Sequence, residues 1–492
     1  MGGSNRKRRS SNSVLSDVRS MIDFFYIKKV PSYGNSFFFT IGVYLLALFG
    51  LLAITGIIMV VFGVQWGYTT GIGNFVRSVH LWAAEAFVTL IFLHLFVNFS
   101  TSMFKRKRLV WILGSVMLFL VLLEFAFGIA LPNDFVAQVN ARAGADLWNG
   151  MGLGFWINPL NRNAVLGWHI AAVPLLLVIL MFTHYMLVKK KGTSTPYRKD
   201  IPYSMVAADH KSIYRRTGYI FAIILLFALL LPAPYTHPMT MQSWAKSSPN
   251  NFALTLLSEF NYSSGTATYL DTIDPYGFST REVYVTAPYY EYINATHQPN
   301  ELQAFLLETH TEQVAEISEA FAYFSTESTS SQNQNQTDPL ISVMETLTGM
   351  AQSGIYGPVL QSESSSESNS TYELLLFSDS EAFDNETTEA GLQVSQLGML
   401  SIGNGTLWQR YMVYWLLPYN VMEVITSGIP WWNDLQNGTA ALIAFAFLMF
   451  LPYIPYLRDA PERLKLYKLF WNRFTIPELR LRKNKSRKKG QA

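Results

Sequence analysis

Residues 77–94 read RSVHLWAAEAFVTLIFLH, an almost wholly apolar run that nevertheless carries Arg77, His80 and His94. Ionisable side chains are costly inside a hydrocarbon layer and are rare there unless they serve a function. The run belongs to a stretch, 76–99, that is long enough to cross a bilayer as a helix, which takes about 20 apolar residues. The two histidines therefore need a chemical explanation.

Six stretches of this kind occur in a chain of 492 residues, of which 50% are hydrophobic and 14% are charged. They cover approximately residues 37–63, 76–99, 109–131, 165–188, 217–236 and 437–456. We expect no cleavable signal peptide, because the N-terminus is polar and basic and the first apolar run is too long for a signal core. The sequence predicts an all-α membrane protein, a bundle of about six transmembrane helices.

Basic residues predict the orientation of this bundle, because Lys and Arg gather on the cytoplasmic side. Basic clusters at 105–108, 189–191 and 480–489 all follow even-numbered spans, whereas the loop 64–74 has no charge. Both termini are then cytoplasmic, and we expect a multi-pass protein of the plasma membrane. No nucleic-acid partner is expected.

A long acidic insert separates the fifth and sixth spans and lies outside in this topology. Residues 247–409 contain 21 Asp or Glu residues but only one basic residue, Arg281. Seven glycosylation sequons fall on the same side, at Asn261, Asn294, Asn335, Asn369, Asn385, Asn404 and Asn437. An eighth, at Asn98, lies within a span and should not be modified. We therefore predict a glycoprotein, and sequons on a membrane protein without cysteine suggest an archaeal source.

Part of the insert is expected to fold, since residues 301–324 show helical periodicity with an acidic face. The insert either covers or docks redox partners or simply protects the surface, and the sequence leaves both roles open. The chain has no cysteine, so disulfides and Cys-ligated clusters are excluded.

Four of the eight histidines lie within predicted spans, His80 and His94 in the second and His169 and His184 in the fourth. A helix turns about 100° and rises 1.5 Å per residue. The first pair, 14 residues apart, therefore returns to within roughly 40° of one face, about 21 Å further along. The second pair, 15 apart, overshoots by about 60°.

The two histidine-bearing spans run in the same direction, so the histidines match in depth. His80 and His169 lie at the outer level, and His94 and His184 lie at the inner level. Facing imidazoles at two depths suit two bis-histidine hemes, of b-type or a modified type. The alternative is that the four histidines pack or hydrogen-bond between helices or carry protons.

Glycines in the other spans repeat the same interval. Gly42 and Gly56 lie in the first span, and Gly114 and Gly128 lie in the third, each pair 14 residues apart. A flat porphyrin needs close backbone, which glycine permits; ordinary small-residue packing is the alternative. Arg77, one turn before His80, either neutralises a heme propionate or snorkels to the interface.

These residues resemble the cytochrome b subunit of quinol-oxidising cytochrome bc complexes, including the shorter chloroplast-type form. The similarity covers about residues 20–236, through "GNFVRSVHLW…LHLF", "WILG…FGIALPND" and "GWHI…FTHYMLVKKKGTSTP". It implies two b-type hemes, an outer quinol-oxidising site and an inner quinone-reducing site. The interval of 15 between His169 and His184 is that of the chloroplast-type form.

The sequence departs from the family pattern at three places. Thr40 stands where the chloroplast-type protein attaches an extra heme through cysteine. The turn that normally reads Leu-Pro-Trp is here Leu131-Pro132-Asn133. The Pro-Glu-Trp-Tyr motif has its nearest match at residues 412–415, where Tyr414 and a tryptophan remain but the glutamate is missing.

Another acid must then take the proton that quinol releases, because an acid–base group near the outer heme is useful. Glu124 in the third span and Glu423 are the candidates, with a structural pair and a solvated loop residue as their alternatives. Inside, "IPYSMVAADHK" resembles the family's quinone-reducing segment, which makes Asp209, and more weakly His210, candidates. A solvated cytoplasmic loop is the alternative for both.

The resemblance implies an electron-transfer subunit, enzymatic as part of a quinol oxidoreductase complex. Quinol would be oxidised outside, with one electron going to a Rieske iron–sulfur protein and the other crossing by way of the two hemes to quinone inside. Other respiratory-chain subunits and a homodimer or larger supercomplex are expected partners. Two rivals stay open: a diheme anchor of another dehydrogenase without bifurcation, and a non-redox carrier or anchor.

The expected organisation has seven parts. They are a basic N-terminus with an interfacial helix (1–35), a four-helix diheme core (36–190), a cytoplasmic loop with the fifth span (191–236), the external insert (237–410), an outer quinol-site segment (411–436), the sixth span (437–456) and a basic tail (457–492).

Overall fold

The computed structural model describes residues 29–63, 65–132, 134–150, 153–154, 157–191, 203–268, 279–326, 338–363, 371–389 and 434–470. The predicted N-terminal interfacial helix, the quinol-site segment 411–436 and most of the basic tail lie outside these residues. Everything below concerns the described part of the chain.

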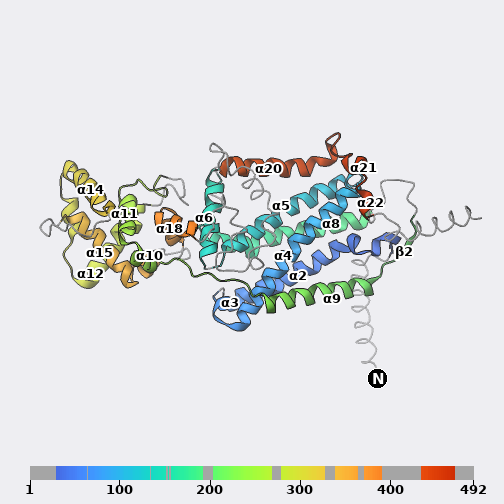
Figure 1. Ribbon diagram of the computed structural model, residues 1–492, viewed down its shortest axis with the longest axis horizontal. Coiled ribbons are helices and arrows are strands. Elements are labelled where there is room, and N and C mark those ends of the chain that lie inside the picture. Colours follow the sequence, from blue (N-terminus) through green and yellow to red (C-terminus); the bar gives the residue numbers. More distant parts are fainter. Residues whose placement is uncertain are drawn as a thin grey trace, which may run out of the picture.

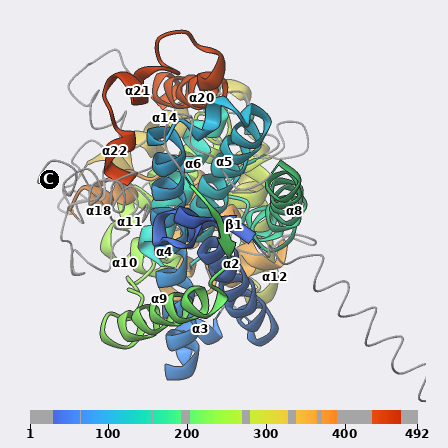
Figure 2. The ribbon, with the colours of Figure 1, turned by 90° about the vertical axis from the view of Figure 1, so that its right-hand side faces the viewer.

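Five helices in the described residues are long and apolar enough to span a membrane. They are α2 (Phe37–Phe62), α4 (Gly71–Ser100), α5 (Arg108–Ala130), the continuous helix Arg162–Lys190, and α9 (His210–Leu230). Figures 1 and 2 show them side by side, α4 packing on α2 and α9 while α5 packs on α8. The predicted all-α membrane bundle is confirmed, and the protein is a multi-pass membrane protein.

The fourth span is made of three segments joined without a break. It begins as α7 (Arg162–Gly167), passes through one π-helical turn, η3 (Trp168–Ala172), and continues as α8 (Val173–Lys191). The side-chain oxygen of Asn161 caps the start by accepting a hydrogen bond from the Ala164 amide at 3.0 Å.

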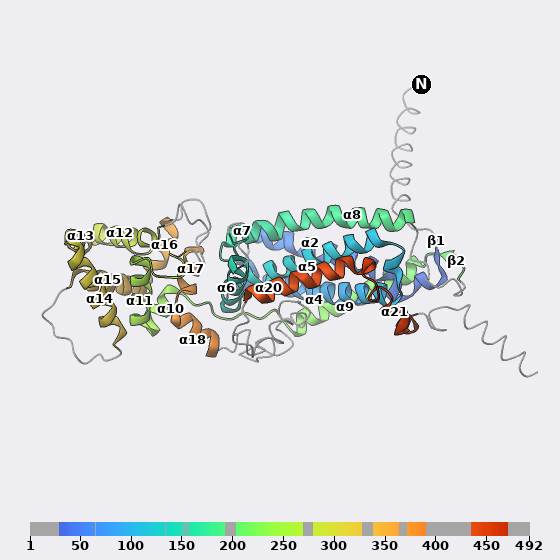
Figure 3. The same ribbon diagram turned by 90° about the horizontal axis from the view of Figure 1, so that it is seen from above.

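The bounds of the spans differ from the predicted ones by up to seven residues, most of all in the fifth and sixth spans. The fifth begins at His210, seven residues before the predicted start, because the Asp209 carboxylate caps the helix by accepting from the Ser212 amide at 3.0 Å. It ends at Leu230, ahead of Pro232, which cannot continue a helix. The sixth forms α20 (Asp434–Phe450), shorter than the other spans, which runs along α5 (Figure 3).

Small elements close the end of the bundle where α2 begins. Strands β1 (Lys29–Pro31) and β2 (Met205–Ala207) pair antiparallel, and the 3-10 turn η1 (Ser32–Asn35) follows β1 directly. The 3-10 turn η2 (Met103–Lys105) follows α4, and its Met103 clusters with Tyr33 of η1. After α20 follow η7 (Leu451–Tyr453), α21 (Ala460–Arg463) and α22 (Tyr467–Phe470). The Lys105 ammonium lies 2.7 Å from Asp459 and 2.9 Å from Glu462, so this loop is bound to the C-terminal segment.

At the opposite end of the bundle lie α3 (Trp66–Thr69) and α6 (Phe135–Gly150). Beyond α6 the insert folds into a helical unit, here called the insert domain (Figure 1). Its helices are α10 (Met241–Ser247), α11 (Pro249–Phe260), η4 (Glu282–Thr286), α12 (Ala287–Thr296), α13 (Glu301–Leu306), α14 (His310–Ser325), α15 (Pro339–Ser353), α16 (Tyr356–Glu363), α17 (Thr371–Ser378) and α18 (Glu381–Glu389). The segment 301–324, expected as one helix, is two.

A capping box explains that break. The Thr309 amide donates to the Glu312 carboxylate at 2.8 Å, and the Glu312 amide in turn donates to the Thr309 hydroxyl. This reciprocal pair satisfies amides that begin a new helix. A new helix therefore starts at His310, and α13 ends before it.

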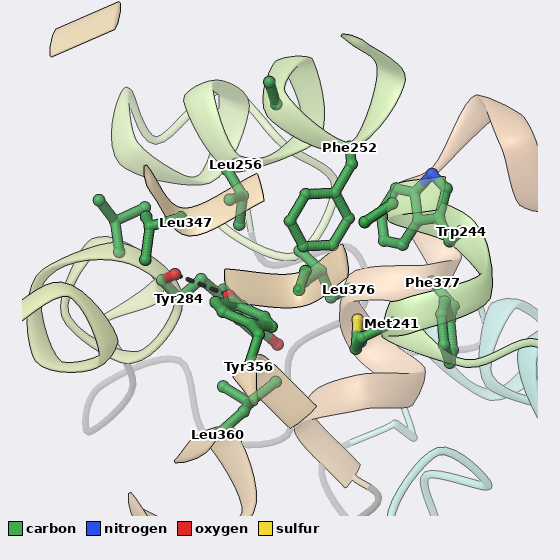
Figure 4. Close-up of a cluster of buried hydrophobic side chains, with 14 of the residues drawn as sticks. Met241, Trp244, Phe252, Leu256, Tyr284, Leu347, Tyr356, Leu360, Leu376 and Phe377 are labelled. Atoms are coloured by element: carbon green, nitrogen blue, oxygen red, sulfur yellow. Dashed lines mark hydrogen bonds between the residues drawn. The ribbon is translucent and has the colours of Figure 1, made fainter. Parts of the chain in front are cut away.

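The insert domain has its own hydrophobic core. Trp244, Phe252, Tyr284 and Tyr356 are fully buried in it, with their rings gathered from four different helical segments (Figure 4). The Tyr356 hydroxyl donates to the Tyr284 carbonyl at 2.7 Å, so a buried polar group is satisfied. The domain is thus a folded unit that depends on apolar burial.

Replacing Phe252 by alanine should destabilise the insert domain by about 3–5 kcal/mol, because the lost contacts leave a cavity. Thermal unfolding of the purified protein, with limited proteolysis of the insert, measures the effect. Leu307→Ala is the control, since this side chain is 80% exposed and should change little. Equal unfolding of the two variants would contradict the core described here.

Candidate cofactor-binding site

The structure brings His80 of α4 and His169 of η3 together. Their ring centroids are 6.3 Å apart, with the ring planes at 69°. A metal–imidazole bond is about 2 Å long, and the ring centre lies roughly 1 Å beyond the nitrogen, so two imidazoles on opposite sides of one metal ion have centroids roughly 6 Å apart. The observed separation would allow both rings to donate to one metal ion.

The π-helical turn explains how His169 and His184, which are 15 residues apart, can reach the same two levels as His80 and His94, which are 14 apart. His169 lies within this turn, and His184 lies on α8 beyond it. A π turn accommodates one extra residue relative to an α-helix, and such bulges are frequent at functional sites. The extra residue is absorbed locally, so the rotational overshoot expected for a regular helix is reduced.

Hydrogen bonds orient both outer imidazoles. His169 Nδ1 lies 3.2 Å from the Glu124 carbonyl oxygen, and His80 Nδ1 lies 2.8 Å from the Thr55 hydroxyl. The Thr55 hydroxyl donates its proton to the Leu51 carbonyl at 2.8 Å, so its oxygen accepts from His80. Both Nδ1 atoms therefore carry protons, and the Nε2 lone pairs are free for a metal ion.

Each predicted glycine lies against one histidine of a neighbouring helix. A Cβ atom added to Gly56 would lie 3.5 Å from His80 Cε1, and one added to Gly128 would lie 2.9 Å from His169 Cε1. The absence of a side chain lets the imidazole approach the helix backbone. In α5 the same approach brings the His169 ring to the Glu124 carbonyl, four residues before Gly128.

The inner pair repeats this arrangement. Added Cβ atoms on Gly42 and Gly114 would lie 3.7 Å from His94 Cε1 and 3.6 Å from His184 Cε1. His94 and His184 are close enough to interact electrostatically. The Asn98 side chain donates to the His94 carbonyl at 2.7 Å, so this sequon residue is engaged within α4.

The residues present fit two hemes by their donor chemistry. Each level offers two imidazoles, and at the outer level both have a free Nε2. Glycines border every imidazole, and buried apolar side chains such as Val79, Trp82 and Leu118 surround the helices that carry them. Bis-histidine heme ligation remains a prediction that this geometry supports.

The side-chain carboxyl of Glu124 and its backbone carbonyl both lie close to Nδ1 of His169. Its Oε1 lies 3.1 Å from His169 Nδ1, while Oε2 is buried and has no hydrogen-bond partner among the described residues. Glu124 thus lies at the outer level, next to Gly128 on the helix face turned to His169. Its predicted role in proton transfer stays a prediction.

Arg77 lies one turn before His80 in α4, and its guanidinium contacts backbone carbonyls and the Tyr68 ring. Its guanidinium donates to the carbonyls of Ala233 at 2.7 Å and Pro234 at 3.0 Å, and it lies 4.5 Å from the centre of the Tyr68 ring. These contacts bind α4 to the segment after α9. Contact with a heme propionate remains a prediction.

The remaining predicted residues lie away from these imidazoles or outside the described residues. Asp209 is exposed before α9, at the end of the bundle opposite α6, where it caps the helix. His210 is the first residue of α9. Tyr414 and Glu423 lie outside the described residues.

Sequence reasoning missed two polar residues inside the bundle. Thr55 accepts from His80, and its signal was a polar residue next to Gly56 in an apolar span. Glu85, five residues after His80, is only 6% exposed. An acid within the opening sequence run was a visible signal, because burial of a carboxyl is costly.

A charged cluster at the outer end of the bundle was also missed. Arg162 donates to the carbonyls of Leu131 and Pro132, in the turn after α5, and interacts electrostatically with Asp134 and with Glu373 of α17. Burial raises the pKa of Asp134, and it raises that of Glu373 to about 7. These residues are far apart in sequence, so no local motif pointed to them.

Part of the chain is similar to known proteins. The family described as "Cytochrome b(N-terminal)/b6/petB" matches residues 85–243. The cytochrome b subunit of the cytochrome bc1 complex of Mycobacterium leprae (strain TN) is 29% identical over 167 residues, 31% of this chain and 30% of that protein. The chain therefore matches less than a third of that relative's length.

A shorter relative is matched over most of its length. Cytochrome b6 of Synechococcus sp. (strain CC9311) is 28% identical over 203 residues, 37% of this chain and 93% of that protein. Among solved structures, a chain of "Hyperthermophilic respiratory Complex III" aligns with 16% identity and a TM-score of 0.38, covering 91% of this chain and 98% of that one.

Gly128→Ala should reduce heme content toward half of the wild-type value, because the new Cβ would lie 2.9 Å from the His169 ring and displace it. The absorbance of the reduced-minus-oxidised spectrum per chain measures this. Gly50→Ala in α2 is the control, since no atom lies within 4 Å of its added Cβ. Full heme content in both variants would contradict the close approach.

Proposed function

Because the chain belongs to the cytochrome b family through its N-terminal domain, we propose that it is the diheme cytochrome b subunit of a respiratory quinol-oxidising complex of bc type. The observation that carries this proposal is the outer imidazole pair, with ring centroids 6.3 Å apart. Two hemes held at these levels would supply one-electron carriers near the two ends of the bundle.

The chain's own residues prepare both levels for this chemistry. Thr55 and the Glu124 carbonyl take the Nδ1 protons of His80 and His169, which leaves both Nε2 atoms as donors. The interval of 14 residues along α4 separates the levels by about 21 Å. Buried apolar side chains between the helices keep water out of this interval.

The outer quinol site is proposed to lie around the turn at residues 131–134. Arg162 holds this turn through the carbonyls of Leu131 and Pro132. Glu124 is the proposed proton acceptor within the described residues, and Tyr414 and Glu423 are proposed to complete the site. At the other end of the bundle, Asp209 is the proposed acid of the inner quinone site.

A partner must hold the iron–sulfur cluster, because this chain has no cysteine to bind one. We assign that role to a Rieske protein at the outer end of the bundle, within a complex that includes other respiratory subunits and two or more copies of this chain. The insert domain packs on α6 through α17, at this same end. It would therefore border the surface that a redox partner uses.

A reduced-minus-oxidised spectrum of the purified full-length protein tests the proposal directly. We expect two bis-histidine hemes per chain, with His80→Ala and His94→Ala each losing one. His310→Ala, an exposed histidine at the start of α14, should keep both. A colourless preparation would exclude a redox function.

The type of complex is decided by a second measurement. A bc-type subunit should co-purify with a Rieske protein, and an inhibitor of the outer quinol site should block quinol-driven reduction. Two hemes without either property would instead identify a diheme anchor of another dehydrogenase.

Glu124→Gln should raise the midpoint potential of the outer heme and leave both hemes bound. An ionised Glu124 carboxylate, 3.1 Å from His169 Nδ1, would stabilise the oxidised, more positive state of an iron bound by that histidine, and an amide would do so less. Each tenfold change in relative stability shifts a one-electron potential by about 59 mV. A redox titration monitored by absorbance measures the midpoint potential of each heme.

The inner heme of the same Glu124→Gln protein is the internal control, and its potential should stay unchanged. Equal shifts at both levels would show a general effect on the bundle. No shift at either level would mean that the carboxyl does not act on His169.

A further inference from the structure

Two buried carboxyl groups meet in the insert domain, away from the histidines. Glu259, near the end of α11, is 0% exposed, and Asp379 lies in the turn directly after α17. The loop after α11 contacts both carboxyl groups, because Ser264 binds Glu259 and Thr266, two residues later, binds Asp379. Like charges close together in a dry interior need a proton or a cation between them.

Hydroxyl groups surround this pair. The Ser264 hydroxyl donates to Glu259 Oε2 at 2.7 Å, and the Thr266 amide donates to Asp379 at 3.1 Å. The Thr280 hydroxyl donates to the Glu259 carbonyl at 2.9 Å. The pair therefore lies where α11, the loop after it, the start of η4 and the end of α17 converge.

Two buried oxygen atoms of this cluster have no hydrogen-bond partner in the described part of the chain. Glu259 Oε1 and the Thr266 hydroxyl, in a residue 1% exposed, are both buried without a hydrogen-bond partner in the described residues. Buried polar atoms are normally satisfied, so each exception needs a reason. Thr266 binds Asp379 through its amide, and Glu259 Oε1 belongs to the other carboxyl of the pair, so both unpartnered atoms lie in residues of this cluster.

No basic side chain among the described residues forms an ion pair with this cluster. Arg281, the only basic residue between positions 247 and 409, donates to the Phe260 carbonyl at 2.7 Å and lies 4.3 Å from the centre of the Phe260 ring. Two carboxylates carry two negative charges, which one divalent cation neutralises and one shared proton does not.

We propose that Glu259, Asp379 and Thr266 form a calcium site that joins α11 to the turn after α17. All the ligand atoms are oxygens, the type that calcium and magnesium prefer. Calcium tolerates irregular coordination by six to eight oxygens, whereas magnesium demands an octahedron and retains its waters. A buried site with carboxylate and hydroxyl ligands therefore suits calcium.

Calcium binding to the purified full-length protein tests the proposal, after removal of bound cations with a chelator. We expect one calcium per insert domain with a Kd of about 0.1–1 mM, the range of extracellular modules. Binding should raise the temperature at which the insert domain unfolds. The heme spectrum should not change.

Glu259→Gln and Asp379→Asn should lose this binding and its stabilisation, while Glu319→Gln, an exposed acid on α14 of the same domain, should keep both. Glutamine resembles protonated glutamic acid, so Glu259→Gln is expected to fold. Calcium binding that survives in Glu259→Gln would place the ion elsewhere. Wild-type protein that ignores calcium and is stabilised only by acid would show that the carboxyls share a proton instead.

Discussion

The histidine pairs of the bundle depend on which ring nitrogen of each imidazole carries the proton. In an apolar interior a neutral imidazole has one N–H to donate and one lone pair to offer, and the acceptor of the N–H decides which nitrogen keeps the lone pair. At the outer level the Thr55 hydroxyl and the Glu124 carbonyl lie at the Nδ1 atoms of His80 and His169. Both Nε2 atoms then remain as donors, and the fold positions two ligands before any cofactor arrives.

The glycines and the π turn serve this same constraint. A Cβ at Gly128 would lie 2.9 Å from His169 Cε1, so the ring would have to move away from the Glu124 carbonyl. The π turn places His169 so that an interval of 15 residues meets the level set by 14 residues in α4. Packing, hydrogen bonding and helix geometry thus together determine how the His80 and His169 rings are placed relative to each other.

The insert domain is stabilised in a different way from the membrane bundle. It is a helical unit with an aromatic core of its own, in a segment with 21 acids and one arginine between residues 247 and 409. Most of these acids can remain in water, but Glu259 is fully buried and Glu373 lies beside Arg162. The domain therefore brings acidic groups both into its own interior and to the outer end of the bundle.

Periodicity and spacing in the sequence determined the spans, the histidines that share a face and the glycines at the same interval. These features are local, because a helix repeats its geometry from residue to residue. The early start of the fifth span was less visible, since it depends on the Asp209 cap, and the break at Thr309 depends on one capping box.

Only the tertiary structure decided which groups meet across helices. Thr55 with His80, Arg162 with the turn at Leu131, and Glu259 with Asp379 are separated by 25 to 120 residues. No local pattern encodes such contacts, because they arise when separate helices pack and remove their polar groups from water together. The sequence thus determined the ligand-bearing helices, and packing decided the hydrogen bonds and charges around them.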